Sequence, residues 1–265
     1  MKADVYQLDG KIAKSIELPS VFNASYREDL VKRALLAEQS TAKQPQGHFL
    51  LAGMQTTARY YGSYGSYRTG RHMGIAIRPR QKLGGGAQGD VRRIPSAVKG
   101  KRAHPHKIEK IITERINAKE YRRAVESAIA STANAKMITE IHPVKTNLPI
   151  VIEDKIESVS KTKEVMKILK DLKLVEDVEK SHKPQLRKGL RRASQRRHFR
   201  NSVLFVVKEA KGLDKSARNI PGVDVVKVNE LSVQKLAPGA RPRITIWSEK
   251  ALNDVESELA KLKAR

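Results

Sequence analysis

Three apolar stretches in the second half of the chain decide its fold: Val203-Leu-Phe-Val-Val207, Val223-Asp-Val-Val-Lys-Val228 and Ile244-Thr-Ile-Trp247. Each has the length, and the β-branched or aromatic content, of a strand that is buried in a sheet. Residues 148–152 and 5–8 are two further strand candidates nearer the N-terminus. The sequence therefore predicts at least five strands, most of them fully buried.

Amphipathic helical patterns separate several of these strands. Apolar residues recur at helical spacing over residues 165–172 and again over residues 252–262. Strands that alternate with helices form parallel sheets covered on both faces. We therefore predict an α/β fold for residues 1–265, a single domain with a mostly parallel sheet flanked by helices in a three-layer, Rossmann-like body.

Two more helices are predicted on either side of a long irregular segment. Ser25 and Glu28 have the spacing of a capping box, ahead of an apolar stripe that ends at Leu35. Pro105 is suited to the first position of a second helix. The isoleucines and other apolar residues over 108–129 continue at helical spacing, so this second helix is predicted to be one long or broken element.

The net charge of the chain limits its partners. Lys and Arg number 53 against 28 Asp and Glu, which gives +25 and exceeds what solubility requires. A polyanion is therefore expected as partner, with RNA, DNA and an anionic membrane all open at this point. The sequence has no cysteine, which removes disulfides and thiolate sites. It has no apolar run long enough to cross a bilayer and no signal-peptide pattern after Met1, so we expect a cytoplasmic protein without a membrane partner.

Two segments hold most of the positive charge. Residues 43–107 contain thirteen Lys and Arg residues and a single acid, Asp90. Residues 180–202 contain nine Lys and Arg residues and no acid. Charge needed only for a solvated surface would be scattered, whereas concentrated charge suits the neutralisation of phosphates. A nuclear-localisation signal is an alternative for the second segment, but it leaves the first unexplained.

Residues 43–105 are predicted to form an extended, irregular loop that is inserted in the domain and penetrates RNA. Eleven of the sixteen glycines lie between Gly47 and Gly100, among tyrosines and without periodicity. Such a segment has no core of its own, so it would become ordered on binding. The tyrosines suit stacking on unpaired bases or packing within the loop, and both remain open.

Motifs for nucleotide, metal or nucleophile chemistry are weak. Gly84–Gly89 lacks the preceding strand, the closing GK[ST] and the following helix of a phosphate-binding loop, so these glycines are expected to allow tight turns against RNA. His104 and His106 have no further ligands at metal-site spacing. In the sequence, His142, His182 and His198 stand apart from any visible Ser, Cys or carboxylate constellation, so no catalytic residue, metal site or cofactor site is predicted.

The predicted RNA-binding residues are the cations of both segments with neighbouring tyrosines and one histidine. They are Arg59, Tyr60, Tyr64, Tyr67, Arg68, Arg71, Arg78, Arg80, Lys82, Arg92, Arg93, Lys99, Lys101, Arg102, His104, Lys107, Arg187, Lys188, Arg191, Arg192, Arg196, Arg197 and Arg200. Arginine predominates in the second segment, as expected where forked contacts to phosphate matter.

Several stretches, in this order along the chain, resemble the large-subunit ribosomal protein L-four family in its archaeal and eukaryotic branch. They are Arg93-Ile-Pro-Ser-Ala-Val-Lys-Gly-Lys-Arg-Ala-His104 continuing to Lys107, Leu148-Pro-Ile-Val151, Ala217-Arg-Asn-Ile-Pro-Gly-Val-Asp224, and Leu236-Ala-Pro-Gly239 leading into Ile244-Thr-Ile-Trp-Ser248. The resemblance covers nearly the whole chain. The chain ends soon after its final predicted helix, without the long basic tail of eukaryotic members, so an archaeal source is expected.

The resemblance implies a non-enzymatic ribosomal component with an α/β body and an extension that reaches the peptide exit tunnel. It implies large-subunit rRNA, neighbouring ribosomal proteins and the nascent peptide as partners. It implies no small-molecule substrate, and no cofactor other than structural magnesium of the rRNA. Thr69, Gly70 and Arg71 resemble the segment nearest the tunnel, and on that analogy residues 67–86 lie near its constriction. The expected functions are rRNA binding and assistance in subunit assembly.

Two other classes of function remain to be distinguished from this one. An RNA- or nucleotide-processing enzyme would place a glycine-rich turn or clustered acids and bases after a strand end, and none follows Val207, Val228 or Trp247. A chromatin-like DNA binder fits the charge but not the resemblance.

Overall fold

A computed structural model describes residues 1–62, 74–186 and 197–261. The chain divides into two compact units. The first, here called the body, comprises residues 1–42 and 113–265, and the second, here called the insertion, comprises residues 43–112. Each unit is described below by itself.

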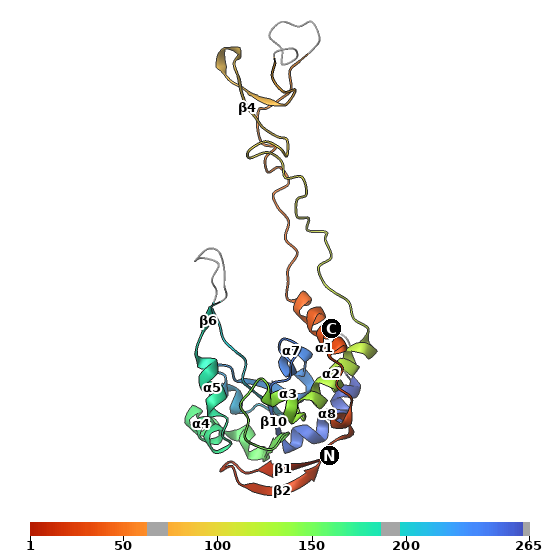
Figure 1. The fold of residues 1–265 in the computed structure, drawn as a ribbon, viewed down its shortest axis with the longest axis vertical. Coiled ribbons are helices and arrows are strands. Elements are labelled where there is room, and N and C mark those ends of the chain that lie inside the picture. The colour runs from red at the N-terminus through yellow and green to blue at the C-terminus, as the bar shows by residue number, and fades with distance from the viewer. Residues whose placement is uncertain (63–73, 187–196, 262–265) are drawn as a thin grey trace. The chain divides into compact units, whose positions relative to one another are not determined.

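The body is built on a six-stranded sheet (Figure 1). In spatial order the strands are β2 (Ile12–Glu17), β1 (Lys2–Tyr6), β5 (Ile150–Ile152), β10 (Ile244–Ser248), β8 (Val203–Val207) and β9 (Asp224–Lys227). Only the β1–β2 hairpin is antiparallel, and β1, β5, β10, β8 and β9 run parallel. The prediction of an α/β fold with a mostly parallel sheet is confirmed.

Helices cover both faces of this sheet. On one face pack α1 (Glu28–Thr41), α2 (Ala118–Ser131), α7 (Val233–Leu236) and α8 (Glu249–Lys261). On the other pack α3 (Ala135–Thr139), α4 (Thr162–Asp171), α5 (Val175–His182) and α6 (Leu213–Ala217). Smaller elements of the body are the 3-10 turns η1 (Ser20–Asn23), η3 (Asp154–Ser158) and η5 (Val228–Glu230) and the hairpin of β6 (Gln185–Leu186) with β7 (Arg197–His198).

The two faces divide the strand residues alternately. Val203, Phe205 and Val207 of β8 enter the core under α4 and α6, whereas Leu204 and Val206 enter the opposite core. All five are buried. A strand covered on both faces excludes polar residues from either side, which explains the continuous apolar run in its sequence.

The helix predicted from Pro105 onward is wrong for its first half. Residues 105–117 carry no helix, and α2 begins only at Ala118. Ile108 and Ile111 are 67% and 79% exposed, so these two residues of the predicted stripe are not buried in a core. A short helix without a buried face is marginal in water. From Tyr121 the pattern meets the core and the helix forms.

The capping box predicted at Ser25 is also wrong. The helix α1 begins at Glu28, with Arg27 at its N-cap and no side-chain cap. The backbone N–H of Arg27 donates instead to the hydroxyl of Ser127 in α2, at 2.7 Å. Glu28 forms an ion pair with Lys32 at 2.5 Å. A tertiary contact therefore replaces the local cap.

Candidate nucleic-acid interface

The insertion contains a small hairpin that the sequence did not predict. Strand β3 (Arg80–Lys82) pairs antiparallel with β4 (Gln88–Val91), and an isolated bridge joins Arg59 to Arg80. The turn η2 (Gly84–Gly86) connects the strands, with Gly85 at φ 70°. A left-handed residue in a tight turn favours glycine. A strand, and not a helix, follows these glycines, as expected from the missing features of a phosphate-binding loop.

Residues 92–101 of the insertion form a close backbone turn. The N–H of Gly100 donates to Ala97 O at 3.0 Å, and that of Lys101 to Arg93 O at 3.3 Å. A Cβ atom on Gly100 would lie 1.9 Å from Ile94 O, so only glycine fits there. Arg93 and Lys99 adopt left-handed φ values of 72° and 58°. Backbone strain of this kind concentrates at functional sites.

Several predicted RNA-binding cations of the insertion remain available to a partner. Their side chains are exposed and form no hydrogen bond or ion pair with another described residue. They are Arg59, Arg93, Lys99, Lys101, Arg102 and Lys107, and His104 shares these properties. The turn at 92–101 thus presents a run of free positive charge.

Three other predicted RNA-binding arginines of the insertion have contacts within it. Arg78 donates to Ser96 Oγ at 3.1 Å, and Arg80 donates to Ala76 O at 3.3 Å. Arg92 donates to Val98 O at 3.0 Å and pairs with Asp90 at 3.1 Å. These arginines stabilise the insertion itself, and contact with RNA remains a prediction for them.

The described tyrosines of the insertion are partly exposed. Tyr60 and Tyr61 are 40% and 49% exposed. The ammonium of Lys82 lies 5.8 Å from the centre of the Tyr61 ring, within the range of a cation–π contact. One ring thus packs within the insertion, and both retain surface on which a base could stack.

Many predicted site residues lie outside the described residues. In the insertion these are Tyr64, Tyr67, Arg68, Thr69, Gly70 and Arg71. In the second basic segment they are Arg187, Lys188, Arg191, Arg192 and Arg196. Arg197 lies in β7. For all of these, RNA contact remains a prediction.

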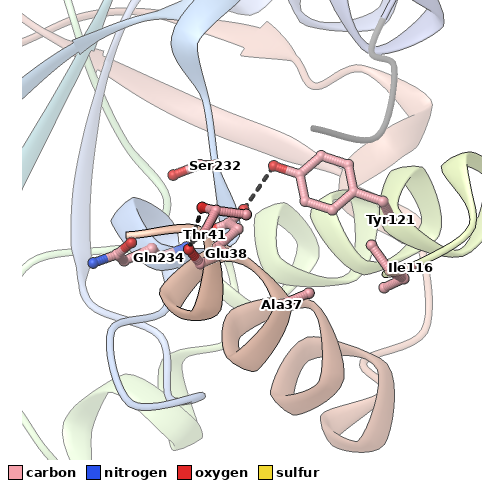
Figure 2. Close-up of a pocket in the computed structure, with 7 residues that line it drawn as sticks. All are labelled: Ala37, Glu38, Thr41, Ile116, Tyr121, Ser232 and Gln234. Atoms are coloured by element: carbon pink, nitrogen blue, oxygen red, sulfur yellow. Dashed lines mark hydrogen bonds between the residues drawn. The ribbon is translucent and has the colours of Figure 1, made fainter. Parts of the chain in front are cut away.

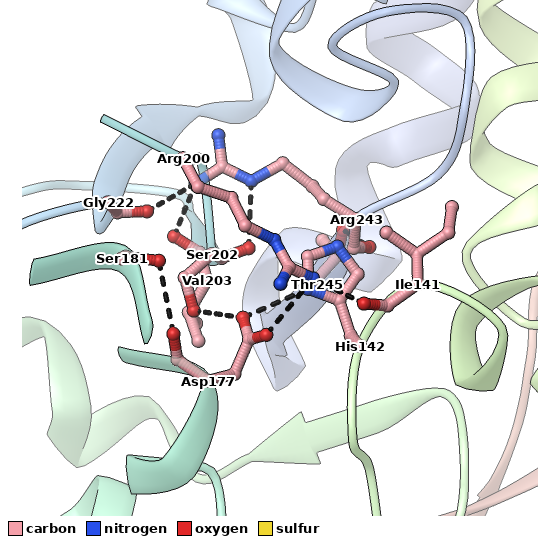
Figure 3. A network of polar contacts seen from close by, with 10 residues as sticks. All are labelled: Ile141, His142, Asp177, Ser181, Arg200, Ser202, Val203, Gly222, Arg243 and Thr245. Atoms are coloured by element: carbon pink, nitrogen blue, oxygen red, sulfur yellow. Dashed lines mark hydrogen bonds and ion pairs between the residues drawn. The ribbon is translucent and has the colours of Figure 1, made fainter. Parts of the chain in front are cut away.

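Arg200, the last cation of the second segment, is engaged within the body (Figure 3). It donates to Ile141 O and lies 3.3 Å from the carboxylate of Asp177. Its side chain is 26% exposed. The guanidinium therefore bonds the end of the basic segment to α5 and to residue 141, and contact with RNA remains a prediction for it.

Asp177 is the centre of this buried polar network. Its carboxylate lies 2.9 Å from His142 Nδ1 and accepts a hydrogen bond from the hydroxyl of Ser202. Burial by itself would raise the pKa of Asp177. The hydrogen bonds from His142 and Ser202 and the charge of Arg200 outweigh burial, so the pKa lies below its ordinary value. The carboxylate therefore stays ionised in the interior.

Arg243 closes the network from the start of β10. Its guanidinium donates to Ser202 O at 3.1 Å, Val203 O at 2.6 Å and Gly222 O at 3.0 Å, and it pairs with Asp224 at 2.7 Å. Its side chain is 1% exposed. Burial lowers the pKa of Arg243, and the bond to Asp224 offsets part of that effect. This arginine ties together the amino ends of β8, β9 and β10.

Two side chains of α1 join the segments of the body that flank the insertion in sequence. The carboxylate of Glu38 accepts a hydrogen bond from Tyr121 Oη at 2.6 Å (Figure 2). It also accepts hydrogen bonds from the N–H groups of Val233 and Gln234 at 3.0 and 2.7 Å. The N–H of Glu114 donates to Ser40 Oγ at 2.8 Å. The chain thus leaves the body and returns to it at points that are joined by hydrogen bonds.

Ion pairs lie at both ends of the parallel strands. At the carboxyl ends of the strands, lysines pair with acids: Lys14 with Glu249 at 2.5 Å, Lys208 with Asp254 at 2.7 Å and Lys250 with Asp154 at 3.7 Å. The second basic segment instead joins the sheet at the amino end of β8. Among the described residues, the amino ends carry ion pairs too, between Arg243 and Asp224 at 2.7 Å and between Lys235 and Asp224 at 3.7 Å.

Over the described ranges, no helix is long and apolar enough to span a bilayer. Among the same residues, no group of three or more His, Cys, Asp or Glu is placed to hold a metal ion.

Comparison with known proteins gives the family. The model of the ribosomal protein L4/L1 family matches residues 16–258. The chain belongs to the ribosomal protein L4/L1 family. The resemblance seen in the sequence is thereby confirmed.

Members of the L4/L1 family from archaea align along nearly the whole chain. Each of the following is named large ribosomal subunit protein uL4. The protein of Methanoculleus marisnigri is 41% identical over 97% of this chain and 99% of its own length. The protein of Archaeoglobus fulgidus is 40% identical over 95% of this chain and 97% of its own length. The protein of Methanocaldococcus jannaschii is 39% identical over 97% of this chain and 98% of its own length.

Proposed function

We propose that this L4/L1 family member is a structural, non-enzymatic constituent of the large ribosomal subunit that binds large-subunit rRNA. The observation that carries the proposal is the run of exposed cations at residues 93–107, whose side chains have no partner among the described residues. Free cations at this density suit successive phosphates. The names of the archaeal relatives support the ribosomal setting, and with it a cytoplasmic location.

The fold supports a division of labour between the two units. The body has two apolar cores and an internally bonded polar network, so it can dock as a preformed surface. The insertion has few buried side chains and much free charge, so its order would come largely from RNA. Binding of both units would tie together separate rRNA segments and so assist assembly of the subunit.

The finer features of the proposal follow the family resemblance. The insertion would line part of the exit tunnel, with Thr69, Gly70 and Arg71 nearest the nascent peptide. Neighbouring ribosomal proteins would complete the surroundings. No cofactor is proposed beyond structural magnesium of the rRNA.

Competition between nucleic acids tests the proposal. The full chain is titrated with transcribed archaeal large-subunit rRNA at physiological salt, and unlabelled rRNA or duplex DNA of equal length competes. We expect rRNA to displace the bound transcript at much lower concentration than DNA, because folded RNA offers unpaired bases as well as phosphates. Equal competition, or a preference for DNA, would contradict the proposal.

A further inference from the structure

The body has a cleft at the amino edge of its sheet. It has a volume of about 660 Å³ and lies between the last turn of α1, residues 141–142, residues 200–201 and the segment 234–243. This volume falls within the roughly 300–1,000 Å³ of ordinary ligand sites. All of its lining belongs to the body, and we call it the amino-edge cleft.

Two arginines in the wall of the cleft, Arg200 and Arg243, already form hydrogen bonds and ion pairs with other residues of the body. Arg243 uses its guanidinium on three carbonyl groups and Asp224, and Arg200 uses its own on Ile141 and Asp177. Their bonds set the shape of the wall. They leave little donor capacity for a ligand.

Two other cations of the cleft are available. Arg241 is exposed and forms no hydrogen bond or ion pair with any residue that the structure describes. Its charge helps lower the pKa of Glu28, but that carboxylate is bonded to Lys32 at 2.5 Å. Lys235 is 46% exposed and lies 3.7 Å from Asp224, a carboxylate that Arg243 already occupies. The cleft thus offers two charges to an anion.

Three carboxamides complete the lining. Gln39, Asn201 and Gln234 are exposed, and their side-chain amides form no hydrogen bond with another described residue. A carboxamide carries both donor and acceptor groups, as do the edges of a nucleobase. Pro238 and Gly239 provide a wall between these polar groups. Cations together with free amides match a nucleotide better than an apolar protein segment.

We propose that the amino-edge cleft receives one unpaired nucleotide of RNA, with its phosphate at Arg241 and Lys235 and its base against the carboxamides. The inference rests on the proposed function and names the element of RNA that the body recognises. The position supports it, because Asn201 is the penultimate residue of the second basic segment, and Gln39 stands four residues before the insertion begins. RNA bound by the second basic segment would pass this edge.

The test uses the full chain and transcribed archaeal large-subunit rRNA, with affinity measured across a range of salt. Arg241→Gln should lower affinity about fivefold at ~0.15 M salt and reduce the slope of log K against log salt by about 0.9, the effect of one phosphate contact. Asn201→Ala should lower affinity by roughly two- to tenfold with the slope unchanged. Lys250→Gln, at the carboxyl edge, is the matched charge control and should bind as wild type. Thermal unfolding should be unchanged in all three, because these side chains are exposed.

The outcomes separate this inference from the proposed function. If wild type binds rRNA with a steep salt dependence and both Arg241→Gln and Asn201→Ala bind equally well, the cleft does not receive a nucleotide. The proposed rRNA-binding function would still hold. If Arg241→Gln lowers rRNA affinity and Asn201→Ala does not, the cleft contacts only a phosphate, and the proposal that it receives a whole nucleotide is overturned. If both variants bind rRNA as wild type does but are absent from assembled large subunits, the cleft binds a protein partner. That result also overturns the proposal of a nucleotide. Failure of wild type to bind rRNA contradicts the function itself.

Discussion

Replacing Lys99, Lys101 and Arg102 together with glutamine should weaken rRNA binding and flatten its salt dependence. These side chains are exposed on and beside the 92–101 turn and have no bond to another described residue. Their loss should therefore leave the fold unchanged. The whole effect should appear in binding.

The size of the effect follows from the number of free charges. Each phosphate contact contributes about 0.9 to the slope of log K against log salt, or about 0.7 on a single strand. Three contacts correspond to a slope change of about two to three, and to roughly a hundredfold lower affinity at ~0.15 M salt. Smaller losses would mean that fewer than three of the side chains meet phosphates.

Fluorescence anisotropy with labelled large-subunit rRNA over about 50–200 mM salt measures both quantities. The matched control replaces Lys14, Lys208 and Lys250, which removes the same charge from side chains that pair with acids. The control should keep nearly the wild-type slope. An unchanged slope in the first variant, or equal changes in both, would refute the assignment of RNA contact to this turn.

Three further predictions concern the fold. Gly100→Ala should increase hydrogen exchange at the Gly100 and Lys101 amides, because its Cβ would meet Ile94 O at 1.9 Å; unchanged exchange would count against the turn. Arg243→Met should lower the free energy of unfolding in urea by roughly 3–5 kcal/mol, since it leaves the carbonyls of Ser202, Val203 and Gly222 without the donor they share; a loss under about 1 kcal/mol would show the network to be dispensable. The pKa of Asp177 is lowered in the fold, so its carboxylate stabilises the protein above about pH 4 and loses that effect as pH falls further. Asp177→Asn should therefore lose less stability than wild type between about pH 5 and 2, and parallel acid unfolding would contradict this.

The sheet could be read from the sequence because its strands are buried on both faces. Such strands leave a continuous apolar run, as at Val203–Val207 and Ile244–Ser248, which few other structures produce. The helices with one buried face were also predictable. The order of strands in space was not, because it depends on pairings between distant segments.

The errors arose where local pattern and tertiary contact disagree. Ile108 and Ile111 have helical spacing but no core to meet, and spacing alone does not reveal whether a partner surface exists. Ser25 has the spacing of a cap, yet the N–H of Arg27 is bonded by Ser127, a hundred residues away in sequence. Neither outcome is encoded within a short window.

The candidate interface was predictable in its charge but not in the role of each residue. A count of cations treats Arg200 and Lys101 alike, whereas the first is bonded to Asp177 and the second is free. The carboxamides of Gln39 and Asn201 gave no signal, because single polar residues at segment ends are common. Only the fold brings them to one cleft.

Co-sedimentation tests the central claim most directly. The full chain is expressed with a small tag in an archaeal host, and lysates are separated on sucrose gradients at low and high salt. We expect the protein in the large-subunit fractions at low salt and its release only at high salt, because phosphate contacts weaken as counterions compete. A protein that stays at the top of the gradient at low salt would contradict the claim that it is a constituent of the large subunit.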